Sequence, residues 1–312
     1  MEGLHVIEHL PANYTFEYEA LFYGTPTFLE ANNVLPQRYF YLVDNHYHKV
    51  FASIAFSIEE GTAYSPAKAP FSGYEFAHRL NPEERIFFMI EVERRLKQTG
   101  VKALNIGQAP SFFNAQIEKE QRDLGFLGYQ KAAARVYHSI SVDSAPFEGK
   151  VHDMEKRKLK KSAQGGLNFQ MLDSSDLEKV FAFIKLQRDL KGYEFSMSWE
   201  ELRDAARLNP GMYLPAVMLH DKKIAAATIA IRESKSVLYN FAPAHAPTYN
   251  ELSPVVALVQ GLYEWSQAQA IKWLNLGTSY LDGAPNEPLV QFKERLGGTS
   301  FSAFSFQKRL NS

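Results

Sequence analysis

In the first half of the chain the pattern of apolar and polar residues predicts β-strands in some segments and α-helices in others. Residues 38–43 and 50–56 are rich in β-branched and aromatic side chains on either side of a short polar turn, which predicts a hairpin. Residues 61–64 continue this pattern as a third strand. A helix is expected to begin at Asn81, because proline and two acids follow it as they follow helix N-caps. The apolar residues 101–106 then predict a further strand.

The second half repeats this order of elements. A hairpin is predicted over residues 212–219 and 223–231, followed by a strand at residues 237–241. Ser253-Pro254 has the form of a second capped helix start, and a buried strand begins at Ile271. Both halves are therefore expected to contain the same succession of hairpin, strand, helix and strand.

A short copy within the sequence indicates a duplication. The segment VKALNIG at residues 101–107 aligns without gaps on IKWLNLG at residues 271–277, a separation of 277 − 107 = 170 residues. Four of the seven positions are identical. The shared element order points the same way, because loop insertions change spacings between duplicated domains while leaving the order intact. The alternative is that two α+β halves resemble one another by chance.

The predicted order of elements determines the expected fold. In each half a helix joins the third strand to the next one, and such right-handed crossovers place two strands side by side in parallel. The expected fold class is α/β in the wider α+β sense: two tandem domains, each with a mixed, mostly antiparallel sheet and helices on both faces. The domains are expected at residues 1–147 and 167–312, with a basic linker helix in residues 148–166 between them.

Composition narrows the classes of function. With 34 Lys plus Arg against 35 Asp plus Glu the net charge is −1, so no overall field attracts nucleic acid or anionic membrane. The absence of cysteine excludes a disulfide framework, a cysteine zinc site and a cysteine nucleophile. We propose no metal site, because His46 and His48 lack a third ligand.

Neither a secretory signal nor an apolar run of about 18 residues occurs, which predicts a cytoplasmic protein without a membrane span. The oligomeric state stays open.

Four motifs carry a resemblance to a known family. They are the basic run at residues 156–166 that ends in Gly-Gly, Asn275-Leu-Gly277, Gln291-Phe-Lys293 and Leu296-Gly-Gly298. In this order and spacing the chain resembles tandem GNAT-fold acyltransferases, and more narrowly the Fem-type aminoacyl transferases and the GNAT acetyltransferases associated with cellulose biosynthesis. The resemblance covers nearly the whole chain. It implies an N-acyltransferase, in which an amine on a small molecule or peptide directly attacks the acyl carbon of acyl-CoA or aminoacyl-tRNA.

The resemblance implies that the second half holds the active cleft, with Phe292 and Lys293 facing it. A lysine there can stabilise developing negative charge; the alternative is a solvated lysine beside a core phenylalanine. Tyr239 and Tyr280 are candidates to protonate the leaving group or to orient the amine. Packing in the core or at its rim is the alternative for each tyrosine. A backbone amide near residues 239–241 is expected to meet the oxyanion.

Four residues are candidate contacts to the acceptor. The counterpart of the Arg188 and Lys191 segment in the resembled family contacts anionic groups, and both side chains suit a phosphate or carboxylate. The alternative is a polar helix end whose cations suit the helix dipole. Asp282 and Asn286 could accept hydrogen bonds from the attacking amine, and they are equally suited to a turn.

The resemblance also implies a place for the donor. A pantetheine chain would pair with the strand at Asn240 and Phe241, and pyrophosphate would lie at the helix that begins at Ser253. The family's glycine-rich loop is absent, since residues 242–254 contain prolines without an amide and Glu251, which would repel phosphate. Acetyl-CoA or another acyl-CoA as co-substrate and aminoacyl-tRNA as donor therefore both stay open, and no tightly bound cofactor is expected.

Two other readings of the sequence stay open. A non-catalytic ligand-binding module is the alternative function, because the missing glycine-rich loop is what a duplicated fold without donor binding would show. The five cations among residues 156–161 suit either tRNA phosphates or a solvated helix face.

Overall fold

The computed structural model describes residues 3–32, 37–66, 69–114, 116–281 and 284–310. Contacts divide the chain into two compact units, which we call unit 1 (Met1–Arg135 and Ser302–Ser312) and unit 2 (Val136–Phe301). This division differs from the predicted boundaries at two places. Residues 136–166 belong to unit 2, and the end of the last strand belongs to unit 1, where it pairs with a strand of the first half.

Unit 1 is built on a sheet with the order β1-β3-β4-β5-β7-β17. Along this order β5 and β7 run parallel and the other neighbours run antiparallel. The elements are β1 (Leu4–Ile7), β2 (Thr15–Phe16), α1 (Pro26–Ala31), β3 (Gln37–Asp44), β4 (Lys49–Glu59), β5 (Thr62–Ser65), β6 (Glu75–Phe76), α2 (Pro82–Gln98), β7 (Ala103–Gly107), α3 (Gln116–Phe126), β8 (Gln130–Ser141) and β17 (Thr299–Arg309), with a 3-10 turn η1 (Phe22–Gly24). Strands β8 and β17 each contribute residues to both units.

Helices cover both faces of the unit 1 sheet. Alternate residues of β4 point to opposite faces. Ile54 and Phe56 share a buried core with the apolar stripe of α2, whereas Ala55 and Ser57 line a narrow crevice with Leu29 of α1. The predicted start of α2 is confirmed, since Asn81 and the glutamate three residues later form a capping box.

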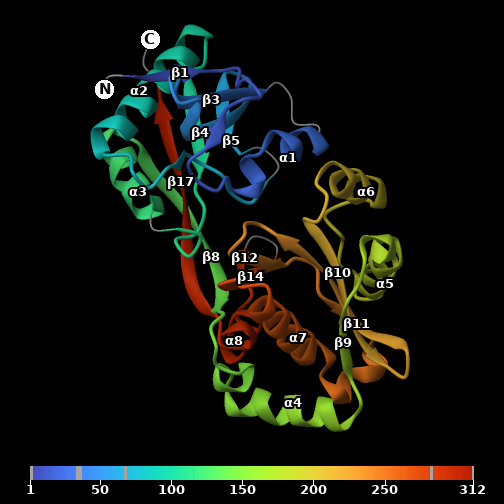
Figure 1. Cartoon of the computed structure of the whole chain (residues 1–312). Helices are drawn as coiled ribbons and strands as arrows, with labels where there is room; N and C mark the ends of the chain where they lie inside the picture. The colour runs from blue at the N-terminus through green and yellow to red at the C-terminus, as the bar shows by residue number, and fades with distance from the viewer. Residues whose placement is uncertain (1–2, 33–36, 67–68, 115, 282–283, 311–312) are drawn as a thin grey trace. The chain divides into compact units, whose positions relative to one another are not determined.

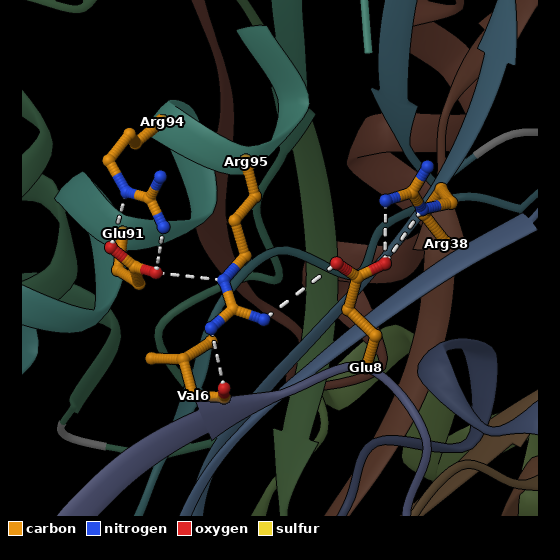
Figure 2. Close-up of polar contacts among 6 residues, drawn as sticks. All are labelled: Val6, Glu8, Arg38, Glu91, Arg94 and Arg95. Atoms are coloured by element: carbon orange, nitrogen blue, oxygen red, sulfur yellow. Dashed lines mark hydrogen bonds and ion pairs between the residues drawn. The ribbon is translucent and has the colours of Figure 1, made fainter. Parts of the chain in front are cut away.

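A network of ion pairs ties α2 to the edge strand β1 (Figure 2). Nη2 of Arg95 donates to the carbonyl oxygen of Val6 (2.8 Å), and Nη1 lies 3.8 Å from Oε1 of Glu8. Glu91 accepts hydrogen bonds from Arg94 and from Arg95 on the same helix. The hydrogen bonds from Arg94 contribute most to holding the pKa of Glu91 at about 2, below its usual 4.5.

Unit 2 repeats the sheet with the order β8-β14-β12-β11-β10-β9. Strands β12 and β14 are parallel, and the other neighbours are antiparallel. The elements are α4 (Asp153–Gln164), β9 (Asn168–Met171), α5 (Leu177–Asp189), α6 (Trp199–Leu208), β10 (Tyr213–His220), β11 (Lys223–Arg232), β12 (Val237–Asn240), β13 (Ala244–His245), α7 (Pro254–Ala268), β14 (Trp273–Thr278), β15 (Tyr280–Leu281), β16 (Ala284–Pro285) and α8 (Glu287–Arg295), with 3-10 turns η2 (Phe147–Gly149), η3 (Ser174–Asp176) and η4 (Pro247–Leu252).

Two long helices cover the unit 2 sheet from opposite sides (Figure 1). Val256, Val259 and Leu262 of α7 share a core cluster with Ala216 and Ala230, while α5 contacts β10, β11 and β13. The predicted hairpin of β10 and β11 is confirmed. Among the described residues, no helix combines the length and the apolar character needed to cross a bilayer.

The two parallel strand pairs share a register as well as an order. Tyr64 lies opposite Asn105 between β5 and β7, and Tyr239 lies opposite Asn275 between β12 and β14. The same two residue types therefore meet at the same place in each unit, which supports the duplication. The predicted fold class, two tandem units with mixed sheets and helices on both faces, is confirmed.

Candidate active site

In unit 2 the parallel strands β12 and β14 end their pairing early. The last residues in register are Tyr239 and Asn275. The amide of Gly277 donates to Oδ1 of Asn275 (2.8 Å), and Nδ2 of Asn275 donates to Oε2 of the buried Glu233 (2.8 Å). Beyond the end of the β12–β14 pairing, the amide of Gly277 is thus held by the side chain of Asn275 and not by the backbone of β12.

Gly277 brings the backbone of β14 against Tyr239. Its φ is +70°, a left-handed value that glycine adopts without strain. A Cβ at this position would lie 2.8 Å from Oη and from Cε2 of Tyr239. Both observations require glycine here. Burial raises the pKa of the Tyr239 hydroxyl, and Glu233 raises it further, so at neutral pH this hydroxyl is an uncharged hydrogen-bond donor.

Lys293 of α8 reaches the same segment of β14. Its Nζ donates to the carbonyl oxygens of Gly277 (3.0 Å) and Thr278 (2.6 Å), and the residue is only 6% exposed. It is therefore not a solvated lysine on a helix surface. Burial lowers the pKa of Lys293 from 10.5 to about 7. The neighbouring Phe292 is half-buried against the core of unit 2.

Aromatic rings connect Arg188 with Tyr239. The guanidinium of Arg188 lies over the ring of Phe195 (5.6 Å), and its Nη2 donates to the carbonyl oxygen of Glu194 (3.1 Å). The ring of Phe195 contacts that of Phe241 (5.9 Å), which in turn contacts Tyr239 (5.7 Å). The half-buried guanidinium of Arg188 is thus oriented by Glu194 and Phe195, which follow α5. A guanidinium held in this way is suited to binding an anionic group.

The remaining catalytic candidate and the remaining candidate contacts to the acceptor lie at surface or turn positions where the structure describes them. Tyr280 is 37% exposed on β15, and Lys191 is exposed. Oδ1 of Asn286 accepts a hydrogen bond from the amide of Leu289 (3.2 Å), so Asn286 caps α8. Asp282 lies outside the described residues. The structure thus brings together Lys293 and Tyr239, with Arg188 linked to them through Phe241.

The predicted donor strand is occupied by internal hydrogen bonds. Oδ1 of Asn240 accepts a hydrogen bond from the hydroxyl of Thr228 (2.7 Å). The amide of Phe241 donates to the carbonyl oxygen of Ile229 (3.2 Å). This amide is therefore not free to meet an oxyanion, which corrects the expectation for Phe241.

Helix α7 begins at Ser253-Pro254 as predicted, but the side chain of Ser253 does not cap it. Ser253 is left-handed (φ 50°) and its side chain makes no capping hydrogen bond. A helix start normally leaves four amides open. Here Pro254 supplies none, the amide of Ser253 donates to Asn250, and that of Val256 donates to Ser253. This geometry leaves little with which α7 could bind a pyrophosphate.

The basic linker helix α4 turns most of its cations to solvent. Leu159 and Ser162 are buried, and the hydroxyl of Ser162 donates to the carbonyl oxygen of Leu252 (2.6 Å). Three of the cations are paired with acids: Lys156 with Asp153 (2.8 Å), Lys158 with Glu155 (2.9 Å) and Lys161 with Glu251 (3.9 Å). These pairs reduce the charge available to phosphates.

In unit 1 the corresponding glycine carbonyl is bound by a backbone amide and not by a lysine. Gly107 is the counterpart of Gly277, and its carbonyl oxygen accepts a hydrogen bond from the amide of Ser72 (2.7 Å) where the loop after β5 returns to the sheet. The position of Lys293 corresponds, at the same separation of 170 residues, to Asp123, which forms a buried ion pair with Arg85 (2.6 Å). Unit 1 therefore has a structural pair where unit 2 has a lysine.

Two polar residues that organise the site, Asn275 and Glu233, were not predicted from the sequence. Asn275 stood in a motif but without a role, although its recurrence as Asn105 was a usable signal. Glu233 follows a hairpin strand, where an acid is usually exposed, and its burial arises only from packing.

Comparison with known proteins identifies the fold. No protein-family model matches the chain, and no curated protein sequence matches it either. The crystal structure of FemX matches with a TM-score of 0.73 at 10% identity, covering 95% of this chain and 94% of that one. The structure of L-PGS from Bacillus licheniformis matches with a TM-score of 0.62 at 14% identity, covering 93% and 89%. A C-terminal domain of a putative lysylphosphatidylglycerol synthetase from Agrobacterium fabrum matches with a TM-score of 0.57 at 14% identity, covering 84% and 81%.

These similarities extend over both units and agree with the element order and the repeated register. At such low identities they establish the fold and not the reaction. The chain therefore has the fold of FemX, in agreement with the tandem fold that the sequence resemblance implies.

Proposed function

We propose that this protein transfers an acyl or aminoacyl group to an amine by direct attack, and that unit 2 carries the reacting centre. The observation behind this proposal is the position of Lys293, buried at the end of β14 with its Nζ on two carbonyl oxygens. The fold shared with FemX, a protein whose name matches the Fem-type transferases that the sequence resembles, is consistent with it.

The geometry of Lys293 suits stabilisation of an oxyanion. A lysine ammonium has three N–H groups, and two of them are held by Gly277 and Thr278. The third is left for a ligand atom. In a site of low exposure a fixed N–H of this kind stabilises the negative charge that develops on a carbonyl oxygen under attack. Tyr239, uncharged at neutral pH, is placed on the neighbouring strand to donate a second hydrogen bond.

The chemistry of the proposed step needs no enzyme nucleophile. The amine nitrogen forms a bond to the acyl carbon, the bond from that carbon to the ester or thioester atom breaks, and the proton released by the amine leaves with the alcohol or thiol product. The protein's part is to hold the acyl group and stabilise the oxyanion between these two events.

We propose an aminoacyl ester as the donor in preference to acyl-CoA. The start of α7 supports this choice, because Pro254 and the hydrogen bonds of Ser253 and Val256 remove the amides that a pyrophosphate needs. The acceptor is an amine, and Arg188 favours one that carries an anionic group nearby.

The test uses the full chain with four probes: bulk aminoacylated tRNA, deacylated tRNA, acetyl-CoA and CoA. A panel of primary amines carrying phosphate or carboxylate groups serves as acceptors, and mass spectrometry detects amide products. We expect product from aminoacyl-tRNA, with turnover roughly 100-fold lower in Lys293→Met, the magnitude of losing one oxyanion donor. Lys272→Met, at an exposed lysine of the same unit, is the matched control and should retain activity.

Each outcome distinguishes the alternatives. Full turnover by a folded Lys293→Met variant would remove Lys293 from the mechanism. Product from acetyl-CoA alone would assign the donor to CoA. No product and no thermal stabilisation by any of the four probes would support the non-catalytic binding module instead.

A further inference from the structure

His138 of β8 is a buried histidine whose polar atoms have no hydrogen-bond partner among the described residues. The residue is 1% exposed, and neither Nδ1 nor Nε2 has such a partner. Other histidines of the chain are bonded, as His245 is to Asn250 (2.9 Å) and His78 is to Gln116 (2.8 Å). A buried polar group without a partner lowers stability, so its presence calls for an explanation beyond packing.

The strand register places His138 beside the segment that Lys293 binds. Asn275 pairs with Ser139 and Thr278 pairs with Tyr137, so the two residues of β14 between them, Leu276 and Gly277, bulge opposite His138. The carbonyl oxygen of Gly277 is one of the two acceptors of Lys293 Nζ.

A second contact joins the same two residues. Gly298 follows α8, and its amide donates to the carbonyl oxygen of Lys293 (2.9 Å). A Cβ on Gly298 would lie 3.4 Å from Cβ of His138. His138 from β8 and Lys293 from α8 thus approach the same two glycines from different elements.

Two charged side chains, Lys293 and Glu294, influence the pKa of His138. Burial lowers the pKa of His138, the nearby Lys293 lowers it further, and Glu294 raises it. Lys293 and Glu294 are the charged groups that act on His138 among the described residues, and Glu294 is exposed. Two buried bases therefore lie together, and the acid that acts on His138, Glu294, is exposed. In a weakly polar interior, two positive charges in this arrangement strongly disfavour one another.

We propose that His138 and Lys293 are a coupled pair that shares a single proton. The proton resides on Lys293 while His138 stays uncharged, and His138 thereby acts as a positioning residue for the charged amine. The pairing stands on the register, the burial and the unpartnered ring nitrogens. Its consequence for turnover rests on the proposed function, because a charged His138 would drive the proton off Lys293 and remove the oxyanion donor.

The experiment follows the His138 ring by NMR as the pH is varied, in the full chain and without any substrate. In the wild type the ring should stay neutral to a lower pH than an exposed histidine does, because burial and Lys293 both lower its pKa. In Lys293→Gln, which keeps neutral N–H donors for the carbonyls of Gly277 and Thr278, the His138 titration should move to higher pH by about one unit or more, as expected for loss of a coupled charge. Lys272→Met is the matched control and should leave the titration unchanged.

A second readout needs no variant. In the wild type, the Lys293 Nζ signal should shift in two steps, the second one coinciding with the titration of His138. A His138 ring that titrates in its ordinary range, or that does not respond to Lys293→Gln while the Lys293 signal shows one step, would overturn the proposal. Retention of turnover by Lys293→Met would instead overturn the proposed function and leave the coupling intact, so the two failures are distinguishable.

Discussion

The phenol ring of Tyr239 covers the backbone of Gly277 so closely that a Cβ at this glycine would lie 2.8 Å from the tyrosine hydroxyl. Two strands separate at this point, and the carbonyl oxygen of the same glycine accepts the Lys293 hydrogen bond. One backbone position therefore sets the placement of both side chains.

Substitution of Gly277 by alanine should be unusually costly. The left-handed φ alone costs about 1–2 kcal/mol for a residue with a Cβ, and the contact with Tyr239 should add about 1–3 kcal/mol of overpacking. Gly166→Ala is the matched control, because Gly166 has a similar φ of +73° and open space around its Cβ position. Urea unfolding of both variants measures the difference. Equal losses would show that the ring moves aside without cost.

Lys293→Met should reduce the rise of stability with pH. The folded-state pKa of Lys293, about 7, lies below its usual 10.5. Between these values the unfolded chain binds more protons, so stability increases with pH, by at most about 1.4 kcal/mol per pH unit from this residue. Unfolding measured at about pH 7 and about pH 9 should show a smaller gain in Lys293→Met than in the wild type or in Lys272→Met. Identical gains in all three proteins would contradict the buried position of the amine.

Glu75 of unit 1 should have the opposite effect on the pH dependence. Burial is the main cause that raises the pKa of this carboxyl from 4.5 to about 8, and the buried Glu120 contributes to it. The folded chain binds more protons than the unfolded chain between these values, so stability falls as pH rises through this window. Glu75→Gln should therefore lose stability less steeply than the wild type between about pH 5 and about pH 8. The exposed Glu118→Gln is the control, and a wild-type slope in Glu75→Gln would refute the prediction.

Glu91 should stabilise unit 1 at neutral pH and cease to do so in acid. Its pKa is held at about 2 by Arg94 and Arg95, below the usual 4.5, so the contribution is present above about pH 4.5 and is lost as pH falls toward 2. Because Arg94 is half exposed, we expect Glu91→Gln to cost only about 1 kcal/mol at neutral pH. Thermal unfolding should show this difference shrinking as the pH is lowered below 4.5. Glu83→Gln, an exposed acid of the same helix, should show no such change.

Much of the fold could be predicted from local pattern. The capping box at Asn81, the hairpin of residues 212–231 and the copy shared by residues 101–107 and 271–277 all depend on residues close together in the sequence. Propensity and periodicity act over a few residues, so they determine where such elements begin and how they follow one another. The predicted helix start at Ser253-Pro254 is confirmed, but Ser253 follows the 3-10 turn η4 in a left-handed conformation and makes no capping hydrogen bond, which its sequence does not reveal.

The candidate site was only partly within reach of the sequence. Lys293 and Tyr239 were predicted from a resemblance, and their catalytic roles stay predictions. Asp282 falls outside the described residues, so its role also stays a prediction. By itself the sequence determined the tandem order of elements, the absence of cysteine chemistry and the helix on which Lys293 lies. The tertiary structure alone decided that this lysine is buried on the carbonyls of a bulged strand, that Phe241 has no free amide and that His138 lies beside Gly277. The physical reason is that burial, register and loss of hydration depend on which distant segments pack together, and no local pattern encodes them.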